Sequence, residues 1–197
     1  MTLPGPNSAG SRSNWRVRQA NANDLPAVAE LHAASWRAAY RGILPDAYLD
    51  GPLNEDRRAR WTGVTEEMAM SDRLLVAERG DVLAGFIAAW ASEHLGCEHG
   101  FDLYIDNLHV RPDLRGQSIG HLLMSALANG LNDEAGCRAY LWLLDGNERA
   151  GRFYAKLGGR LSDRRHIVIA DETIGETRIE WDNFRRLSSP DVAPHSR

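Results

Sequence analysis

The chain has 197 residues, of which 43% are hydrophobic and 25% are charged, and its formal net charge is −4. These values are typical of one soluble globular domain and leave little room for a second core. The small negative charge, without blocks of like charge, argues against nucleic acid as a partner, and no apolar run is long enough to span a membrane. The first residues lack the apolar stretch of a secretion signal, so we expect a cytoplasmic protein.

Both ends of the chain lack hydrophobic periodicity. Residues 1–13 are rich in proline, glycine and serine, and residues 185–197 are rich in proline and serine. Such segments bury too little apolar surface to fold, so we expect disorder at both ends. The folded part is predicted to be one domain over residues 14–184, without internal repeats.

The first half of this domain is predicted to open with a strand. Residues 15–20 alternate in the way that favours a half-buried strand. Asn23 or Asp24 can cap the helix that follows, and we expect this helix to end near Gly42. Charged residues dominate residues 46–70, which predicts a second, more solvated helix.

The second half is predicted to contain most of the strands. A tight turn at Gly80 and Asp81 separates two of them, and the final pair is expected to be joined by a turn that holds Gly175. The predicted strands cover residues 73–78, 82–90, 101–110, 139–144, 166–170 and 177–181. Helices are predicted after residue 118 and over residues 147–157. This order of elements indicates the α/β (or α+β) class.

Two cysteines, Cys97 and Cys137, can form at most one disulfide. Nothing in the chain indicates an oxidising compartment, so we expect free thiols. His94 and His99 flank Cys97, but this spacing matches no zinc-binding pattern and no second cluster completes four ligands. We therefore expect a solvent-exposed loop here and no metal.

The segment from Leu108 to Met124 joins a strand to an amphipathic helix through the turn Arg-Gly-Gln-Ser-Ile-Gly. Free amide groups and the macrodipole at the start of a helix make this junction suitable for a phosphate group. Gly116 and Gly120 allow close approach to the backbone, and Arg115 adds positive charge. The sequence matches neither the glycine-rich motif of mononucleotide-binding loops nor that of dinucleotide-binding loops. This argues against ATP and NAD as the ligand. Taken alone, the segment is also consistent with an ordinary strand-to-helix turn.

A second motif, Asn-x-x-Ala-x-x-Phe-Tyr-x-x-x-Gly, begins at Asn147. Taken alone, Phe153 and Tyr154 are also consistent with core aromatic residues at the end of a helix. Together the two motifs resemble the GNAT superfamily of N-acyltransferases, whose first motif is Arg/Gln-x-x-Gly-x-Gly/Ala. Ser118 stands where that family usually has glycine, although serine suits a helix N-terminus and its hydroxyl would add a donor.

The resemblance covers nearly all of the predicted domain and implies its fold and activity. It implies a mixed central sheet of six to seven strands flanked by about four helices. The implied enzyme is an N-acetyltransferase that uses acetyl-CoA, without a metal, to acetylate a primary amine of a small molecule or peptide by direct attack in a ternary complex. Related proteins are often homodimers. A non-catalytic acyl-CoA binding or sensing module on the same fold is the alternative.

The resemblance also implies site residues. Tyr154 is expected to protonate the leaving thiolate, because a phenol with an ordinary pKa of about 10 is protonated at neutral pH. Asn147 is expected to bond the pantetheine arm. The residues expected to bind the coenzyme are Leu108, His109, Val110, Arg115, Gly116, Gln117, Ser118, Ile119, Gly120, His121 and Asn147.

The general base is harder to derive from the sequence. Many family members carry a glutamate on the strand before the first motif, and Tyr104 matches that position here. Asp106 lies two residues further along the same strand face and is our candidate base, although a solvated or hydrogen-bonded aspartate is equally consistent with the sequence. His109 is a second candidate, with its side chain expected on the opposite face of the strand from Asp106.

Two aromatic residues of the first helix are candidates for the acceptor site. Trp36 and Tyr40 lie one turn apart and can form an aromatic wall of the acceptor site. Arg37 or Arg41 can bind an acidic group of the acceptor. The same two rings can instead seal the helix onto the sheet. The sequence leaves both interpretations open.

Overall fold

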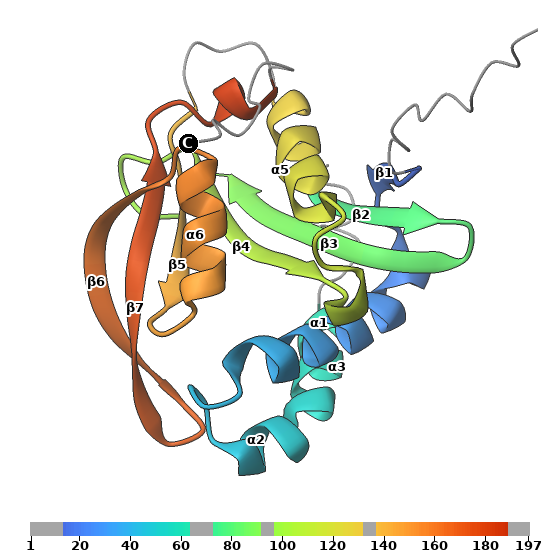
Figure 1. Ribbon diagram of the computed structural model, residues 1–197, viewed down its shortest axis with the longest axis vertical. Coiled ribbons are helices and arrows are strands. Elements are labelled where there is room, and N and C mark those ends of the chain that lie inside the picture. The colour runs from blue at the N-terminus through green and yellow to red at the C-terminus, as the bar shows by residue number, and fades with distance from the viewer. Residues whose placement is uncertain (1–13, 64–72, 92–96, 132–136, 189–197) are drawn as a thin grey trace, which may run out of the picture.

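The computed structural model describes residues 14–63, 73–91, 97–131 and 137–188, and their strands form one seven-stranded sheet (Figure 1). The order of strands in the sheet is β1-β2-β3-β4-β5-β7-β6. The strands are β1 (Arg16–Gln19), β2 (Leu74–Arg79), β3 (Val82–Ala91), β4 (Leu103–Val110), β5 (Ala139–Leu144), β6 (Arg160–Ile169) and β7 (Glu172–Trp181). Neighbouring strands are antiparallel except β4 and β5, which are parallel. The predicted α/β class and mixed sheet are confirmed.

Helices cover both faces of this sheet. The helices of the described ranges are α1 (Leu25–Tyr40), α2 (Asp46–Asp50), α3 (Leu53–Thr62), α5 (Ile119–Asn129) and α6 (Glu148–Lys156). Residues of α5 and α6 pack on one face, in a core with side chains of the central strands. Residues of α1 and Trp61 of α3 pack on the other face against β2 and β3. None of the helices in the described ranges has the length and hydropathy to span a membrane.

The first helix begins differently from the expectation. Asn21 forms a capping box one turn earlier, in which its side chain accepts from the Asn23 amide at 2.9 Å and its own amide donates to Asp24 at 2.8 Å. Asp24 is the N-cap of α1 but makes no side-chain capping bond there. Its carboxylate is instead held by Arg18, which lowers the pKa of Asp24. The predicted end of the helix before Gly42 agrees with the structure.

The parallel pair β4 and β5 is short, and this positions the cleft described below. Only two residue pairs join these strands, Leu103 with Ala139 and Tyr104 with Tyr140. Beyond them the strands diverge (Figure 1), while β4 stays paired with β3 and β5 stays paired with β7. The sheet therefore consists of two halves that are joined at one end and separate at the other.

A bulge in β4 changes which side chains share a face. Ala88 pairs with Asn107 and Ala89 pairs with Ile105, so Asp106 is an extra residue in the ladder. Asp106 and Asn107 consequently lie on the same face, where Asn107 Nδ2 donates to Asp106 Oδ2 at 2.6 Å.

The bulge overturns the expectation that Asp106 and His109 point to opposite faces. Asp106 forms an ion pair with Arg60 of α3, and His109 lies 3.1 Å from the hydroxyl of Ser35 on α1. Helices α1 and α3 pack together on this face of the sheet. Simple alternation along the strand fails because it assumes an unbroken ladder.

Three segments differ from the predicted elements. Strands β6 and β7 are longer than expected, and their turn is Ala170–Asp171 rather than the region of Gly175, which lies inside β7. β6 is an edge strand with most of its residues exposed, so it lacks the alternation that predicts a strand. The charged region from residue 46 forms two helices rather than one, and residues 64–70 of that prediction lie outside the described residues.

The folded domain also extends past the expected boundary at residue 184. Residues Phe184–Ser188 form a short 3-10 helix, in which Phe184 and Leu187 are buried in the core beside α5. Their spacing of three residues places both side chains on one face of the turn. The expected disordered segments at residues 1–13 and 189–197 lie outside the described residues.

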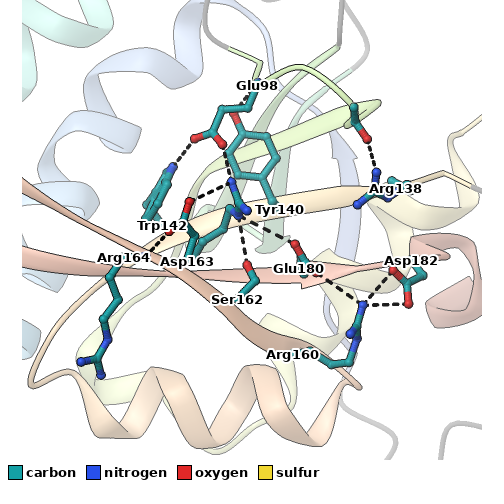
Figure 2. Close-up of polar contacts among 12 residues, drawn as sticks. Glu98, Arg138, Tyr140, Trp142, Arg160, Ser162, Asp163, Arg164, Glu180 and Asp182 are labelled. Atoms are coloured by element: carbon teal, nitrogen blue, oxygen red, sulfur yellow. Dashed lines mark hydrogen bonds and ion pairs between the residues drawn. The ribbon is translucent and has the colours of Figure 1, made fainter.

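A network of polar contacts braces the outer half of the sheet (Figure 2). Glu98 accepts hydrogen bonds from Trp142 of β5 at 2.9 Å and from Arg178 of β7 at 2.5 Å, and its amide donates to the Tyr140 hydroxyl at 2.9 Å. This half-buried glutamate is therefore not part of the solvent-exposed loop that we expected around Cys97. Both cysteines are free thiols, and His94 lies outside the described residues.

Candidate functional site

A cleft of about 840 Å³ lies where β4 and β5 separate. Its walls come from α1, β4, the turn after β4, the start of α5, β5 and α6. The two sequence motifs, far apart in the chain, both reach this cleft. The site residues of the sequence analysis that line it are Tyr40, Asp106, Leu108, His109, Val110, Arg115, Gly116, Ser118, Ile119, Gly120, His121, Asn147 and Tyr154.

The start of α5 presents free amide groups to the cleft. The first intrahelical bond runs from the Leu122 amide to the Ser118 carbonyl at 2.9 Å, so the amides of residues 119–121 have no partner within the helix. Gly116 has a φ of +86°, which lets the turn bend back before the helix. Arg115 and Arg149 face the cleft from different walls, and burial together with the charge of Arg149 lowers the pKa of Arg115. This arrangement suits a polyanion.

Ser118 occupies a left-handed backbone conformation, with φ 60° and ψ 13°. It is the N-cap of α5, but its side chain makes no capping hydrogen bond, so the expected advantage of serine at this position is absent. For residues other than glycine, this backbone conformation costs about 1–2 kcal/mol of free energy. The structure thus gives a physical reason for glycine at the matching position of the motif.

Substitution Ser118→Gly is expected to raise the free energy of unfolding by roughly 0.5–1 kcal/mol. The relief of strain exceeds the extra backbone entropy that glycine loses on folding, which is about 0.5–1 kcal/mol. Urea denaturation of the variant and the unmodified protein measures the difference. Ser125→Gly, inside α5, is the matched control and should lower stability by a similar amount; two variants with equal losses would contradict the argument.

Two phenols and the Asn147 side chain line the cleft. Tyr154 is only 7% exposed, and burial, with a smaller contribution from the charge of Tyr40, raises its pKa above the ordinary value. Burial also raises the pKa of Tyr40 to about 12, partly offset by a hydrogen bond from Asn147. The Asn147 side chain also accepts from the Ala150 amide at 3.2 Å and so caps α6. Both tyrosines are therefore protonated at neutral pH.

Asp106 and His109 line the α1 side of the cleft. The Asp106 side chain is 15% exposed and is held by Arg60 and Asn107. The His109 ring stacks on His32, with 4.4 Å between ring centroids. Burial and the nearby guanidinium groups lower the pKa of His109 to about 3, so this imidazole is neutral at physiological pH.

Comparison with known proteins identifies the family. The family described as "Acetyltransferase (GNAT) family" matches residues 25–159. The chain belongs to this family. It is therefore a GNAT-type N-acetyltransferase, and the matched range includes the turn at residues 115–120 and the segment that begins at Asn147.

Relatives and solved structures agree with this assignment. The protein named "Probable N-acetyltransferase Rv2775" of Mycobacterium tuberculosis is 27% identical over 157 residues, which cover 73% of this chain and 79% of that protein. The PaiA N-acetyltransferase of Thermoplasma acidophilum, solved in complex with coenzyme A, superposes with a TM-score of 0.61 at 19% identity and covers 83% of this chain and 98% of its own. YncA of Salmonella typhimurium, solved with its cofactor acetyl-CoA, has a TM-score of 0.58 at 17% identity, with coverage of 93% and 99%. The structural likeness shows the GNAT fold.

Several predicted site residues have side-chain partners within the protein. Trp36 is absent from the cleft lining and packs edge-on against Tyr40, with 5.0 Å between ring centroids. Gln117 accepts a hydrogen bond from Trp15 at 3.3 Å. Arg37 donates to the Leu49 carbonyl, and Arg41 pairs with Asp46 and Asp50. Trp36, Arg37 and Arg41 therefore fasten α1 to its surroundings in this GNAT protein, while Tyr40 lines the cleft.

The sequence analysis missed four residues near the cleft of this GNAT protein. Ser35 and Arg149 line it, Arg60 binds Asp106, and Arg57 lies beside His32. Arg57 and Arg60 occur in a charged run that predicts a solvated helix. Their spacing of three residues places both on one helix face, but nothing in the sequence separates them from the other charged residues of the run.

Proposed function

We propose that this chain transfers the acetyl group of acetyl-CoA to a primary amine of a small molecule or peptide, by direct attack in a ternary complex. One observation carries the proposal. A single cleft brings together the free amides of a helix N-terminus, a gap in the sheet, and a buried phenol that is protonated at neutral pH. The complexes of PaiA with coenzyme A and of YncA with acetyl-CoA support the choice of acyl donor.

The edge of β4 supplies donors to the gap. The Arg111 amide donates to the Ala84 carbonyl of β3 at 2.8 Å. Because amides alternate in direction along an antiparallel ladder, the amide of Val110 faces away from β3, towards the gap. It is thus suited to donate a hydrogen bond to the carbonyl oxygen of a thioester as negative charge develops there. Leu108 has the same orientation as Val110.

The proposed reaction needs three proton transfers. Acetyl-CoA, when bound, supplies a thioester whose carbon–sulfur bond breaks as the carbon–nitrogen bond forms. The Tyr154 hydroxyl gives its proton to the departing sulfur and regains one from the nitrogen as the amide forms, and the attacking ammonium group must first lose a proton to become an amine. Asp106 is our candidate for accepting that proton, directly or through water, because its carboxylate lines the cleft and is fixed by Arg60 and Asn107.

Ligand-induced stabilisation is the first test of this proposal. Acetyl-CoA at about 100 times its dissociation constant is expected to stabilise the protein by roughly 2.7 kcal/mol, whereas ATP and NAD at the same concentration should produce much smaller shifts. Differential scanning fluorimetry measures the three responses side by side. A larger shift with NAD or ATP would contradict acetyl-CoA as the donor.

Thiol release is the second test. A screen over amines, including polyamines, aminoglycosides, amino acids and peptide N-termini, should find acceptors that release coenzyme A from acetyl-CoA. Binding of acetyl-CoA without thiol release in the presence of any amine would instead favour an acyl-CoA binding or sensing module.

A further inference from the structure

His32 and Arg57 present hydrogen-bond donors to each other, with no acceptor between them. His32 is 1% exposed, and its Nδ1 accepts from Trp61 Nε1 at 3.0 Å. Because an indole N–H can only donate, Nδ1 is unprotonated and the neutral ring carries its proton on Nε2. That Nε2 lies 3.5 Å from Nη1 of Arg57, which is also only a donor.

Arg57 has a further donor without a partner. Its Nε atom is buried and forms no hydrogen bond with any described residue. Its guanidinium face lies over the Trp36 ring, 4.4 Å from the centroid, and Tyr48 bonds it as a neutral partner. Within the described residues, no carboxylate forms an ion pair with Arg57. Burial, together with the charge of Arg60, lowers the pKa of Arg57, although Tyr48 and the Asp56 carboxylate act in the opposite direction.

These donors lie beside the α1 side of the cleft. The His32 ring stacks on His109, which lines the cleft. The charge of Arg57 contributes to the lowered pKa of His109 and partly offsets the raised pKa of Tyr40. Arg60, one turn further along α3, already holds Asp106. Of these two guanidinium groups, Arg60 is thus already paired with a carboxylate, whereas Arg57 forms no ion pair with a described residue.

Removal of a charge from water is costly unless a charge of opposite sign accompanies it. A guanidinium group offers Nε and Nη hydrogens in one plane, which matches the two oxygens of a carboxylate. His32 Nε2 lies 3.5 Å from Nη1 of the same guanidinium group and adds a third donor to this region. The partner that completes this arrangement is an oxyanion.

We infer that Arg57 and His32 form an oxyanion subsite for the acceptor, so that the acceptor is a primary amine that also carries a carboxylate, such as a free amino acid or an ω-amino acid. This inference rests on the proposed function, because it places the acceptor on the α1 and α3 side of the cleft. The α5 side, with its free helix amides, is left to the acyl donor. Phosphonates have the same oxyanion chemistry and form a separate arm of the test.

A matched series of acceptors tests the inference. For each chain length, thiol release is measured with an alkylamine, the corresponding ω-amino carboxylate and the corresponding aminoalkylphosphonate, each over a range of concentrations. The carboxylates are expected to have a kcat/KM roughly 10- to 100-fold above that of the alkylamines. The reason is that hydrogen bonds to a charged group contribute more free energy than hydrogen bonds between neutral groups. Equal values for alkylamines and carboxylates would overturn the inference, and a preference for phosphonates would overturn the choice of carboxylate.

Variants then assign the preference to Arg57. Arg57→Gln should remove most of the difference between carboxylates and alkylamines, mainly through a higher KM, and Arg57→Lys should restore part of it. Arg58→Gln is the matched control, since Arg58 is exposed and lies 3.8 Å from Glu30 in a surface ion pair. Circular dichroism establishes that each variant is folded. A preference that survives in Arg57→Gln would overturn the assignment.

The failure of this inference is distinguishable from that of the proposed function. If no amine releases thiol, calorimetry with 6-aminohexanoate and the protein saturated with coenzyme A tests the subsite directly. Binding that Arg57→Gln weakens roughly 10-fold or more supports the subsite without the reaction. No binding, or equal binding to both proteins, overturns it.

Discussion

Substitution Tyr154→Phe is expected to lower kcat by about 10²- to 10⁴-fold, the range typical of a general acid. The phenol hydroxyl is the group that we propose to protonate the departing sulfur, and phenylalanine has no proton to give. The rest of the ring should stay in place, because it packs edge-on against Phe153 and Trp181 at centroid distances of 5.2 and 6.0 Å. Affinity for acetyl-CoA should therefore change little. Steady-state thiol release and calorimetric binding measure the two effects separately.

Two further tyrosines make this test specific. Tyr140→Phe removes a phenol from β5 whose hydroxyl accepts a hydrogen bond from the Glu98 amide, and Tyr140 does not line the cleft. It controls for the loss of a buried hydroxyl as such. Tyr40→Phe removes the other phenol that lines the cleft. If Tyr40→Phe alone abolishes turnover while Tyr154→Phe leaves it unchanged, Tyr154 is not the acid.

The second large effect is expected in folding stability at mildly acidic pH. Burial lowers the pKa of His109 from the ordinary 6.5 to about 3 and lowers that of His32 as well. Below pH 6.5 these histidines take up protons in the unfolded chain but not in the folded protein. The free energy of unfolding therefore decreases as the pH is lowered. The stability is fully present above pH 6.5 and is lost progressively towards pH 3. Each histidine is expected to contribute a loss of about 2 kcal/mol between pH 6.5 and 5.

Urea denaturation at several pH values between 5 and 7 measures this loss. This window is informative because most carboxylates titrate below it. In His109→Gln, the fall in unfolding free energy between pH 6.5 and 5 should be smaller by about 2 kcal/mol. His166→Gln, at an exposed position on β6, is the control and should leave the profile unchanged. Identical profiles for the unmodified protein and His109→Gln would show that His109 does not cause the acid sensitivity.

The parts of the site that follow from local sequence were accessible before the structure. The turn at Arg115 and Gly116 and the cap at Asn147 depend on short-range requirements, such as free helix amides and a side chain that can accept from Ala150. The strand over residues 139–144 was also predictable, because it is buried and continuously apolar. These features need no knowledge of distant partners.

The missed features all depend on contacts between segments distant in sequence. The bulge at Asp106 arises from how β4 pairs with β3, and no pattern within β4 marks it. Arg57 is one of several charged residues in α3 and is distinguished only by its contacts with His32 and Trp36 of α1. Much of β6 escaped prediction because an exposed edge strand has no buried face to impose alternation.

The short pairing of β4 with β5 gives this sheet two extra edges in the middle of the molecule. Backbone groups at such edges lack the ladder partners that strands normally provide, and unpaired edges are usually sites of unwanted association. Here the edges face each other across a cleft that α5 and α6 cover on one side, so a ligand with amide groups can pair where another strand cannot. We therefore expect a ligand bound in the gap to pair with backbone groups that strand pairing leaves free.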